Sequence, residues 1–407
     1  MRWENKKLSD CCISIADGDH QPPPKADSGI PFVTIANISA TNQFDFSNTM
    51  FVPQEYYNRL DSKRKAQKDD ILYSVVGSFG IPVYMRETIP FVFQRHIAIL
   101  RPNESILPKF LYYTMLSRDF YMMADAAALG AAQRTISLTA LRNMKIAVPL
   151  MDIQKKIADI LSAYDDLIEN NQKQIKLLEE AAQRLYKEWF VDLRFPGHET
   201  TPIVDGVPEG WTYKPFSEVF DYVRGKSYTS KELSDTTGIL MANLKNIRAF
   251  GGYNRNAEKR FTGQYKANQM LYTGDIVMGV TDMTQERRLV GHVALVPDLG
   301  EKMTFSMDLI KIIPKLTDNL FLYSAMYYGG LSKQISPLAN GVNVLHLKPE
   351  AMMGIEMLIP TKDILERYHQ QFAPMVTRIE ALQKQCDVAA KARDRLIPKL
   401  MNREIEV

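Results

Sequence analysis

The 407-residue chain has only three cysteines, Cys11, Cys12 and Cys386, and six histidines that stand far apart. So few cysteines exclude a disulfide framework, and they cannot supply four zinc ligands without help from the scattered histidines. We therefore expect three reduced, structural thiols and no bound metal. The DGDH stretch at 17–20 offers carboxylates and an imidazole, but the prolines that follow it favour a rigid turn.

Long apolar runs are missing too. No stretch of 18 apolar residues occurs, and the N-terminal MRWENKKLSDC lacks the apolar segment of a signal peptide. We expect no membrane association and no secretion, so the cytoplasm is the predicted location. The composition, 45% apolar and 24% charged, is that of a globular protein. The length predicts two domains or more, because single cores rarely grow this large.

Catalytic signatures and strong net charge are absent as well. The sequence contains no GxxxxGK(S/T) phosphate loop and no HExxH, GxSxG or CxxC motif. It also lacks the F-x-G-x-G and Asn-Pro-Pro-Tyr pair that an adenine methyltransferase needs. We therefore do not expect this chain to catalyse a reaction. The net charge of +3 is too small to indicate nucleic-acid binding by itself.

The chain does contain an internal repeat. Five segments recur in the same order, at an offset of about 205 to 212 residues, which indicates a duplicated unit. The matched pairs are FVTIANI at 32–38 with GILMANL at 238–244, KDDILYSVVGSFG at 68–80 with TGDIVMGVTDMTQ at 273–285, RHIAILRP at 95–102 with MDLIKIIP at 307–314, KFLYYTMLSRDFYMMA at 109–124 with LFLYSAMYYGGLSKQI at 320–335, and LGAAQRTISLTALRNMKIAVP at 129–149 with LANGVNVLHLKPEAMMGIEMLIP at 338–360.

A heptad pattern follows each repeat, with apolar or small residues in steps of four and three. It predicts two long helices, which could pack on their own domains, although their similar length favours pairing with each other. Asn171 fits a polar residue that sets the register. Pro374 should kink or restart the second helix, and Pro398 should fray its end. The expected pairing positions are Ile157, Leu161, Tyr164, Ile168, Asn171, Ile175, Leu178, Leu185, Trp189, Tyr368, Phe372, Met375, Ile379, Leu382 and Leu396.

These patterns predict an α+β protein with two repeated α/β domains and two long antiparallel helices. The expected parts are a first domain at 1–151, a first long helix at 152–193, a linker at 194–211, a second domain at 212–360 and a second long helix at 361–407. The linker is inferred from RFPGHETTPIVDGVPEGW, which is rich in Pro, Gly and Thr.

Polar loops in both repeats suit contact with DNA, although each could equally be an ordinary surface turn. Arg134 could pair with guanine in bidentate fashion, and Gln133, Asn340 and Asn343 with adenine. The stretches RGKSYTSK and TDMTQERR carry the side chains that usually position phosphates. The full set of candidate DNA contacts is His20, Lys63, Arg64, Lys65, Gln133, Arg134, Thr135, Lys226, Tyr228, Gln285, Arg287, Arg288, Asn340 and Asn343.

Over nearly its whole length, the pattern resembles the specificity subunit of type I restriction-modification enzymes. The resemblance rests on the order and duplication of the parts, on IAVPLMDIQKKIADIL and IEMLIPTKDILERY before the heptads, on VPEGW at 207–211 and on the DGDHQPPP turn. Of the two helix starts, IPTKDILERY matches the family's usual pattern less well.

The resemblance implies a DNA-recognition subunit without catalysis and without a cofactor of its own. Two target recognition domains, related by a pseudo-two-fold axis, would each recognise half of a bipartite site in double-stranded DNA. The helical pair would set the gap and dock two methyltransferase subunits, on which S-adenosylmethionine is expected. Restriction/translocase subunits would complete the assembly.

Two other hypotheses remain open. The chain could be a methyltransferase or nuclease whose motifs are unrecognisable, or a coiled-coil scaffold that joins proteins and never contacts DNA. Salt-dependent DNA binding separates the scaffold from the main hypothesis, because phosphate contacts release counterions.

Overall fold

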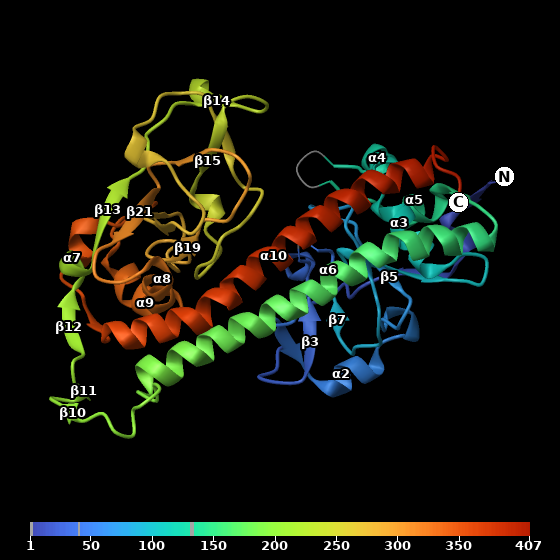
Figure 1. Cartoon of the computed structure of the whole chain (residues 1–407). Helices are drawn as coiled ribbons and strands as arrows, with labels where there is room; N and C mark the ends of the chain where they lie inside the picture. Colours follow the sequence, from blue (N-terminus) through green and yellow to red (C-terminus); the bar gives the residue numbers. More distant parts are fainter. Residues whose placement is uncertain (1–2, 40, 131–133) are drawn as a thin grey trace. The chain divides into compact units, whose positions relative to one another are not determined.

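The computed structural model describes residues 3–39, 41–130 and 134–407. The chain forms two compact units (Figure 1). Unit 1 contains Met1–Asn170 and Cys386–Val407, and unit 2 contains Asn171–Gln385. Each unit thus combines a globular part with portions of both long helices, whereas the sequence analysis assigned the helices to separate segments. The α+β fold class is confirmed.

Unit 1 is built in three layers around a four-stranded antiparallel sheet of order β2-β8-β5-β6. A three-stranded sheet of order β4-β3-β7 covers one face, and helices cover the other. The strands are β1 (Glu4–Lys7), β2 (Cys12–Asp17), β3 (Ile30–Val33), β4 (Met50–Val52), β5 (Ile71–Ser74), β6 (Pro82–Tyr84), β7 (Val92–Phe93), β8 (Ile97–Pro102) and β9 (Lys145–Val148). The helices are α1 (Leu8–Cys11), α2 (Gln54–Arg59), α3 (Pro108–Leu116), α4 (Arg118–Ala127) and α5 (Leu138–Asn143).

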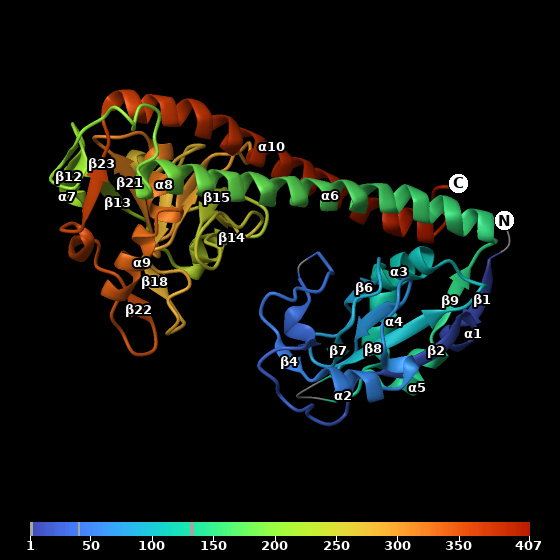
Figure 2. The same ribbon diagram turned by 90° about the horizontal axis from the view of Figure 1, so that it is seen from below.

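The alternation of side chains along β5 explains this layering. Ile71 and Tyr73 point into the core under α3 and α4, whereas Leu72 points into the core shared with β3 and β7. Successive side chains of a strand face opposite sides, so a strand with both faces covered is apolar throughout. Figure 2 shows α3 and α4 beside this sheet, and β1 paired with β9 at its far end.

Unit 2 repeats the same layers. Its four-stranded sheet has the order β13-β21-β17-β19, and a second sheet of order β14-β16-β15-β20 covers one face. The strands of these sheets are β13 (Phe220–Arg224), β14 (Leu233–Ser234), β15 (Ile239–Ala242), β16 (Lys259–Phe261), β17 (Ile276–Gly279), β19 (Val293–Leu295), β20 (Met303–Phe305) and β21 (Leu309–Pro314). The remaining elements of the globular part are α7 (Phe216–Val219), α8 (Asn319–Tyr327), α9 (Leu331–Ile335), β12 (Thr212–Pro215), β18 (Thr281–Asp282), β22 (Leu345–His346) and β23 (Glu356–Ile359).

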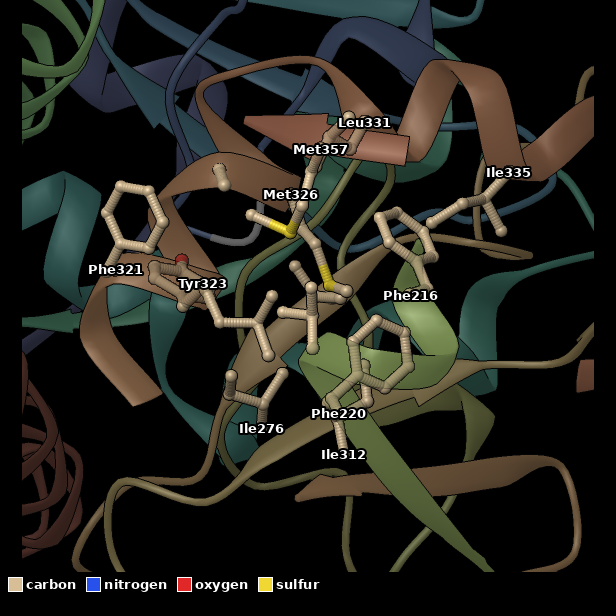
Figure 3. Close-up of a cluster of buried hydrophobic side chains, with 14 of the residues drawn as sticks. Phe216, Phe220, Ile276, Ile312, Phe321, Tyr323, Met326, Leu331, Ile335 and Met357 are labelled. Atoms are coloured by element: carbon tan, nitrogen blue, oxygen red, sulfur yellow. The ribbon is translucent and has the colours of Figure 1, made fainter. Parts of the chain in front are cut away.

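The core of unit 2 lies between its four-stranded sheet and α8. Ile276 and Ile312 from the sheet meet Phe321, Met326 and Phe216 of α7 in one cluster (Figure 3). Val277, the residue between Ile276 and Met278, turns to the opposite face and packs with Phe305. This is the same alternation as in β5, about 205 residues earlier in the chain.

The predicted repeat is therefore present in three dimensions, but two of its matches are shifted. Asn37 corresponds to Asn246, not to Asn243, because each accepts the backbone N–H of the residue three positions earlier, at 2.9 Å. Ile136 corresponds to Leu347, since each donates its N–H at 2.8 Å to a carbonyl directly after a strand of the four-stranded sheet, β5 in unit 1 and β17 in unit 2. The sequence match had placed Ile136 level with Leu345. The spacing of apolar residues in the sequence does not show which residue closes a turn.

The two long helices are α6 (Met151–Tyr186) and α10 (Lys362–Met401), and they are antiparallel in each unit. In unit 1, Asp165 bonds Arg393, and the carbonyl of Ile168 accepts the Cys386 thiol. In unit 2, the Asn171 amide donates to Gln385 at 3.1 Å. The predicted pairing of the helices is confirmed, and all the predicted pairing positions are buried or half-buried.

The ends of the helices differ from the prediction. α10 runs without a break through Pro374 and ends at Met401, three residues beyond Pro398. Both prolines are exposed, so their rings lie on the solvent side, away from the buried seam. α6 gives way to a π-helical turn at Lys187–Val191.

The predicted linker is partly ordered. The hairpin of β10 (Ile203–Val204) and β11 (Val207–Pro208) lies within it, and the turn between the strands is Asp205-Gly206. Both turn residues have positive φ, which suits a type I′ turn. Phe195 and Trp211, at the two ends of the segment, are buried against each other with ring centroids 4.8 Å apart.

The start of α6 is anchored by a buried glutamine. The Gln154 side chain accepts the backbone N–H of Leu107 at 2.7 Å and donates to the carbonyl of Pro149 at 3.0 Å. Leu365 occupies the matching place in the first turn of the second helix. A leucine cannot form these hydrogen bonds. The second helix, whose start resembles the family pattern less well, therefore lacks the anchor that Gln154 gives the first.

Candidate nucleic-acid interface

A pair of adjoining hollows marks one edge of the sheet in unit 1. Asp17 at the end of β2 and Thr135 line the first hollow, while Asp19 and His20 line the second. Arg95 and His96, which directly precede β8, line both. Val75 and Val76, which directly follow β5, also line the first hollow. The neighbouring strands β2 and β8 therefore bring polar side chains together at this edge, beside apolar residues that follow β5.

The backbone of this edge is fixed by hydrogen bonds. Gly18 donates its N–H to the carbonyl of Ile97, and Arg95 donates its N–H to the carbonyl of Asp19 at 3.0 Å. A Cβ atom on Gly18 would overlap the carbonyl oxygen of Phe93, so a larger residue cannot be accommodated without movement. The turn at 17–20 is therefore held closely against the start of β8.

Predicted contacts of unit 1 gather at this turn. Asp17 accepts a hydrogen bond from His20 Nε2 at 2.7 Å and lies 3.7 Å from an amino nitrogen of Arg64. Lys63, the residue before Arg64, is exposed. Lys65 points elsewhere, because its Nζ donates to the carbonyl of Asn58 and lies over the Tyr57 ring.

Arg134 is engaged within the protein. Its guanidinium bonds the carboxylate and the carbonyl of Asp125 on α4, and it lies 5.5 Å from the centroid of the Phe79 ring. Thr135 exchanges backbone hydrogen bonds with Leu129, which closes the loop that the sequence analysis singled out. Gln133 lies outside the described residues. The predicted guanine contact would require Arg134 to leave Asp125.

The corresponding turn of unit 2 is RGKS at 224–227. Gly225 donates its N–H to the carbonyl of Leu309 at 3.1 Å, and a Cβ there would overlap the carbonyl oxygen of Ser306. Lys226 forms a parallel β-bridge with Ser306, just as Asp19 does with Gln94 in unit 1. The turn thus carries Arg and Lys in unit 2 where unit 1 carries two aspartates. The matching frame holds side chains of opposite charge.

The loop 340–346 in unit 2 is closed in the same way as 129–135 in unit 1. Asn340 and His346 exchange backbone hydrogen bonds at 3.0 and 2.9 Å. The Gln285 amide donates to the carbonyl of Val342 at 2.7 Å, while the Asn340 amide turns back to the carbonyl of Leu338. Asn343 is exposed at the tip. Gln285 and Asn343 are therefore brought to one place, as a shared interface requires.

Two other predicted contacts of unit 2, Arg288 and Tyr228, are held by local partners. Arg288 pairs with Glu286 at 2.6 Å. Arg287 has a positive φ of 51°, and its Nε is buried. Tyr228 accepts a hydrogen bond from Lys259 Nζ at 2.6 Å.

Asp282 fixes the loop that carries Gln285, Arg287 and Arg288. Its carboxylate is nearly fully buried and accepts the N–H groups of Thr284, Leu289 and Val290 and the hydroxyl of Thr284. Burial alone would raise the pKa of Asp282, but these hydrogen bonds outweigh it and hold the pKa below its usual value. The ionised carboxylate therefore stabilises this loop.

We predict that Asp282→Ala lowers the free energy of unfolding by about 1–3 kcal/mol at pH 7, because buried N–H groups lose their acceptor. The folded-state pKa is depressed, so this contribution is complete above the unfolded-state pKa of about 3.9 and is lost as pH falls through the folded value. Urea unfolding at pH 7 and pH 3 measures it. The difference in the free energy of unfolding between wild type and Asp282→Ala should be smaller at pH 3 than at pH 7. Asp235→Ala, at an exposed position, is the control.

Several residues of this edge, most clearly Arg95 and His96 in unit 1, were not among the contacts predicted from the sequence. Burial lowers the pKa of His96, and the charge of Arg95 lowers it further, so the imidazole favours its neutral form. Met307 and Asp308 occupy the matching places in unit 2. The sequence did contain a signal for them. These pairs begin the matched segments RHIAILRP and MDLIKIIP, and they differ completely although the strands that follow are alike.

Comparison with known proteins adds to this geometry. The family model described as "Type I restriction modification DNA specificity domain" matches residues 2–180. The MjaIX specificity subunit of Methanocaldococcus jannaschii, a type I restriction enzyme component, is 26% identical over all of this chain and 94% of its own length. The HindI specificity subunit of Haemophilus influenzae is 22% identical over 92% of this chain and 95% of its own.

A solved structure shares the fold. The crystal structure of a type I restriction-modification S subunit from M. genitalium superposes with a TM-score of 0.59 at 14% sequence identity, covering 98% of this chain and 96% of that one. Within the part of the chain that the structure describes, none of the helices combines the length and apolarity needed to cross a bilayer. The same residues contain no cluster of three or more His, Cys, Asp or Glu side chains suited to a metal ion.

Proposed function

We propose that this chain, which belongs to the family of type I restriction-modification specificity subunits, recognises a bipartite DNA site with one half read by each unit. The chain is a DNA-recognition subunit rather than an enzyme. One observation carries the proposal: two units with matching strands and turns hold different side chains at matching positions of the same edge, such as Asp19 against Lys226. A duplicated frame with altered polar groups suits two different base sequences.

Further parts of the proposal follow from the family. The paired helices would set the gap between the half-sites in a pseudo-two-fold arrangement, and their outer faces would dock two methyltransferase subunits. Those subunits would bind S-adenosylmethionine and supply the methyl group, while restriction/translocase subunits would complete the complex. The heptad seam supports the first part, because side chains buried between α6 and α10 fix the two helices against each other.

Binding of the full chain to a duplex library with a randomised region tests the proposal. We expect selection to enrich two short motifs separated by a fixed gap. The affinity should fall steeply as salt rises, since phosphate contacts release counterions. A protein scaffold without DNA contact would enrich no motif and would show no such salt dependence, and that outcome would overturn the proposal.

Arg134→Ala tests the base contact predicted from the sequence. If Arg134 leaves Asp125 to contact guanine, the variant should lose about 1–3 kcal/mol of discrimination at one position of one half-site. Competition between the selected duplex and single-base variants of it measures this loss. Equal weakening on every duplex would instead show a phosphate contact, and unchanged binding would show that the Asp125 pair persists on DNA.

A further inference from the structure

We infer that Arg95 and Met307, which occupy matching positions in the two units, determine one base pair in each half-site: guanine for Arg95 and thymine for Met307. The inference rests on the proposed function and goes beyond it by naming the residues and the bases. Neither residue was among the contacts predicted from the sequence.

The match between the two positions is set by the backbone. Arg95 donates its N–H to the carbonyl of Asp19, and Met307 donates its N–H to the carbonyl of Lys226, both at 3.0 Å. Each residue lies two positions before a central strand, β8 or β21. Residues on such rigid turns are presented in a fixed direction, which recognition of a base edge requires.

Arg95 is free to bind a ligand. Its side chain is exposed and lies where the two hollows of unit 1 adjoin. Among the described residues, no carboxylate pairs with its guanidinium, whereas Arg64 is paired with Asp17 and Arg134 with Asp125. A free guanidinium can donate two parallel hydrogen bonds to O6 and N7 of guanine in the major groove.

Met307 offers a different chemistry at the same place. Its side chain is 55% exposed, although it is apolar, and the hydroxyl of Ser227 contacts its sulfur at 3.3 Å. Lys226 supplies a positive charge to the same turn, while Arg224 is paired with Glu350 at 2.8 Å. An exposed methionine beside Lys226 suits a DNA surface that presents a methyl group. Among the four unmodified bases, thymine alone carries such a group, on C5, in the major groove.

The experiment compares four full-length proteins, namely wild type, Arg95→Met, Arg95→Lys and Met307→Ala, on the duplex that the wild type selects. Arg95→Met should reduce discrimination for guanine at one position by about ten- to a hundredfold and leave the other half-site unchanged. Arg95→Lys should not restore it, because an ammonium group cannot form the same planar pair. Thermal unfolding of each variant confirms that it is folded.

The thymine arm uses duplexes in which uracil replaces thymine at single positions, which removes only the methyl group. At one position of the half-site that Arg95→Met leaves unchanged, uracil should weaken wild-type binding several-fold, because burial of that methyl group against Met307 no longer contributes to the affinity. Met307→Ala should bind both duplexes alike.

Each other outcome decides against the inference. Uniform weakening by Arg95→Met, restored by Arg95→Lys, would make Arg95 a phosphate contact. If Arg95→Met altered base discrimination in both half-sites, or in neither, position 95 would not determine a base. Equal wild-type affinity for thymine and uracil at every position would remove the role of Met307. If the wild type selects no bipartite motif, the proposed function itself fails and the inference fails with it.

Discussion

Arg393→Leu should lower the free energy of unfolding by about 3–5 kcal/mol, because it leaves the carboxylate of Asp165 buried without its cation. Arg393 Nη1 lies 2.5 Å from Asp165 Oδ1, and the two side chains are only 18% and 12% exposed. The hydroxyl of Tyr113 on α3 donates to the other oxygen of Asp165 at 2.6 Å. This network joins both long helices to the globular part of unit 1.

Urea unfolding of single and double variants measures the effect. The double variant Asp165→Leu with Arg393→Leu should recover most of the loss, since it removes both charges. The matched control is Arg367→Leu on the same helix, whose ion pair with Asp363 is largely exposed and should contribute less than about 1 kcal/mol. A loss below about 1 kcal/mol for Arg393→Leu would mean that solvent screens the buried pair.

Phe372→Ala should be similarly costly in unit 2, at about 3–5 kcal/mol, because truncation leaves a cavity in a packed aromatic cluster. Phe372 is fully buried, and its ring lies stacked on Tyr368 with the centroids 5.3 Å apart. Tyr368 in turn meets Phe190 at 4.8 Å and Trp189 at 5.9 Å. The cluster therefore connects α10 to the end of the first helical segment.

Chemical denaturation of the full chain checks this prediction. Phe372→Leu should lose less than Phe372→Ala, because leucine fills more of the cavity. Leu177→Ala on α6, where the side chain is 64% exposed, should change stability by no more than about 0.5 kcal/mol. If Phe372→Ala behaved like Leu177→Ala, the cluster would not stabilise the helix pair.

The helix pair could be predicted because its signal is long and periodic. Steps of four and three from Ile157 onward place one apolar stripe along a helix, and only a partner surface can cover it. The repeated units were found for a similar reason, since buried strands such as β5 and β17 carry runs of apolar residues. It was harder to predict which residues of the two repeats correspond, because the turn that contains Asn37 is defined by a hydrogen bond and not by apolar spacing.

The candidate interface was less accessible to sequence reasoning. Arg134 has the right chemistry, but its partner Asp125 lies on a different element, and only the fold brings the two together. Arg95 stands next to a buried strand, and the sequence indicates it only as the first residue of a repeated segment. Polar residues on a surface loop are common, so a side chain's partners, and not its type, decide whether it is free to bind.

Gly18 and Gly225 suggest how this protein could be re-engineered. Both glycines allow the turn to lie against the start of a central strand, where any side chain would collide with backbone. A mutagenesis library should therefore keep these two positions constant and randomise the three residues at 94–96 or 306–308. Variants built in this way would retain the scaffold while their sequence preference is reprogrammed one module at a time.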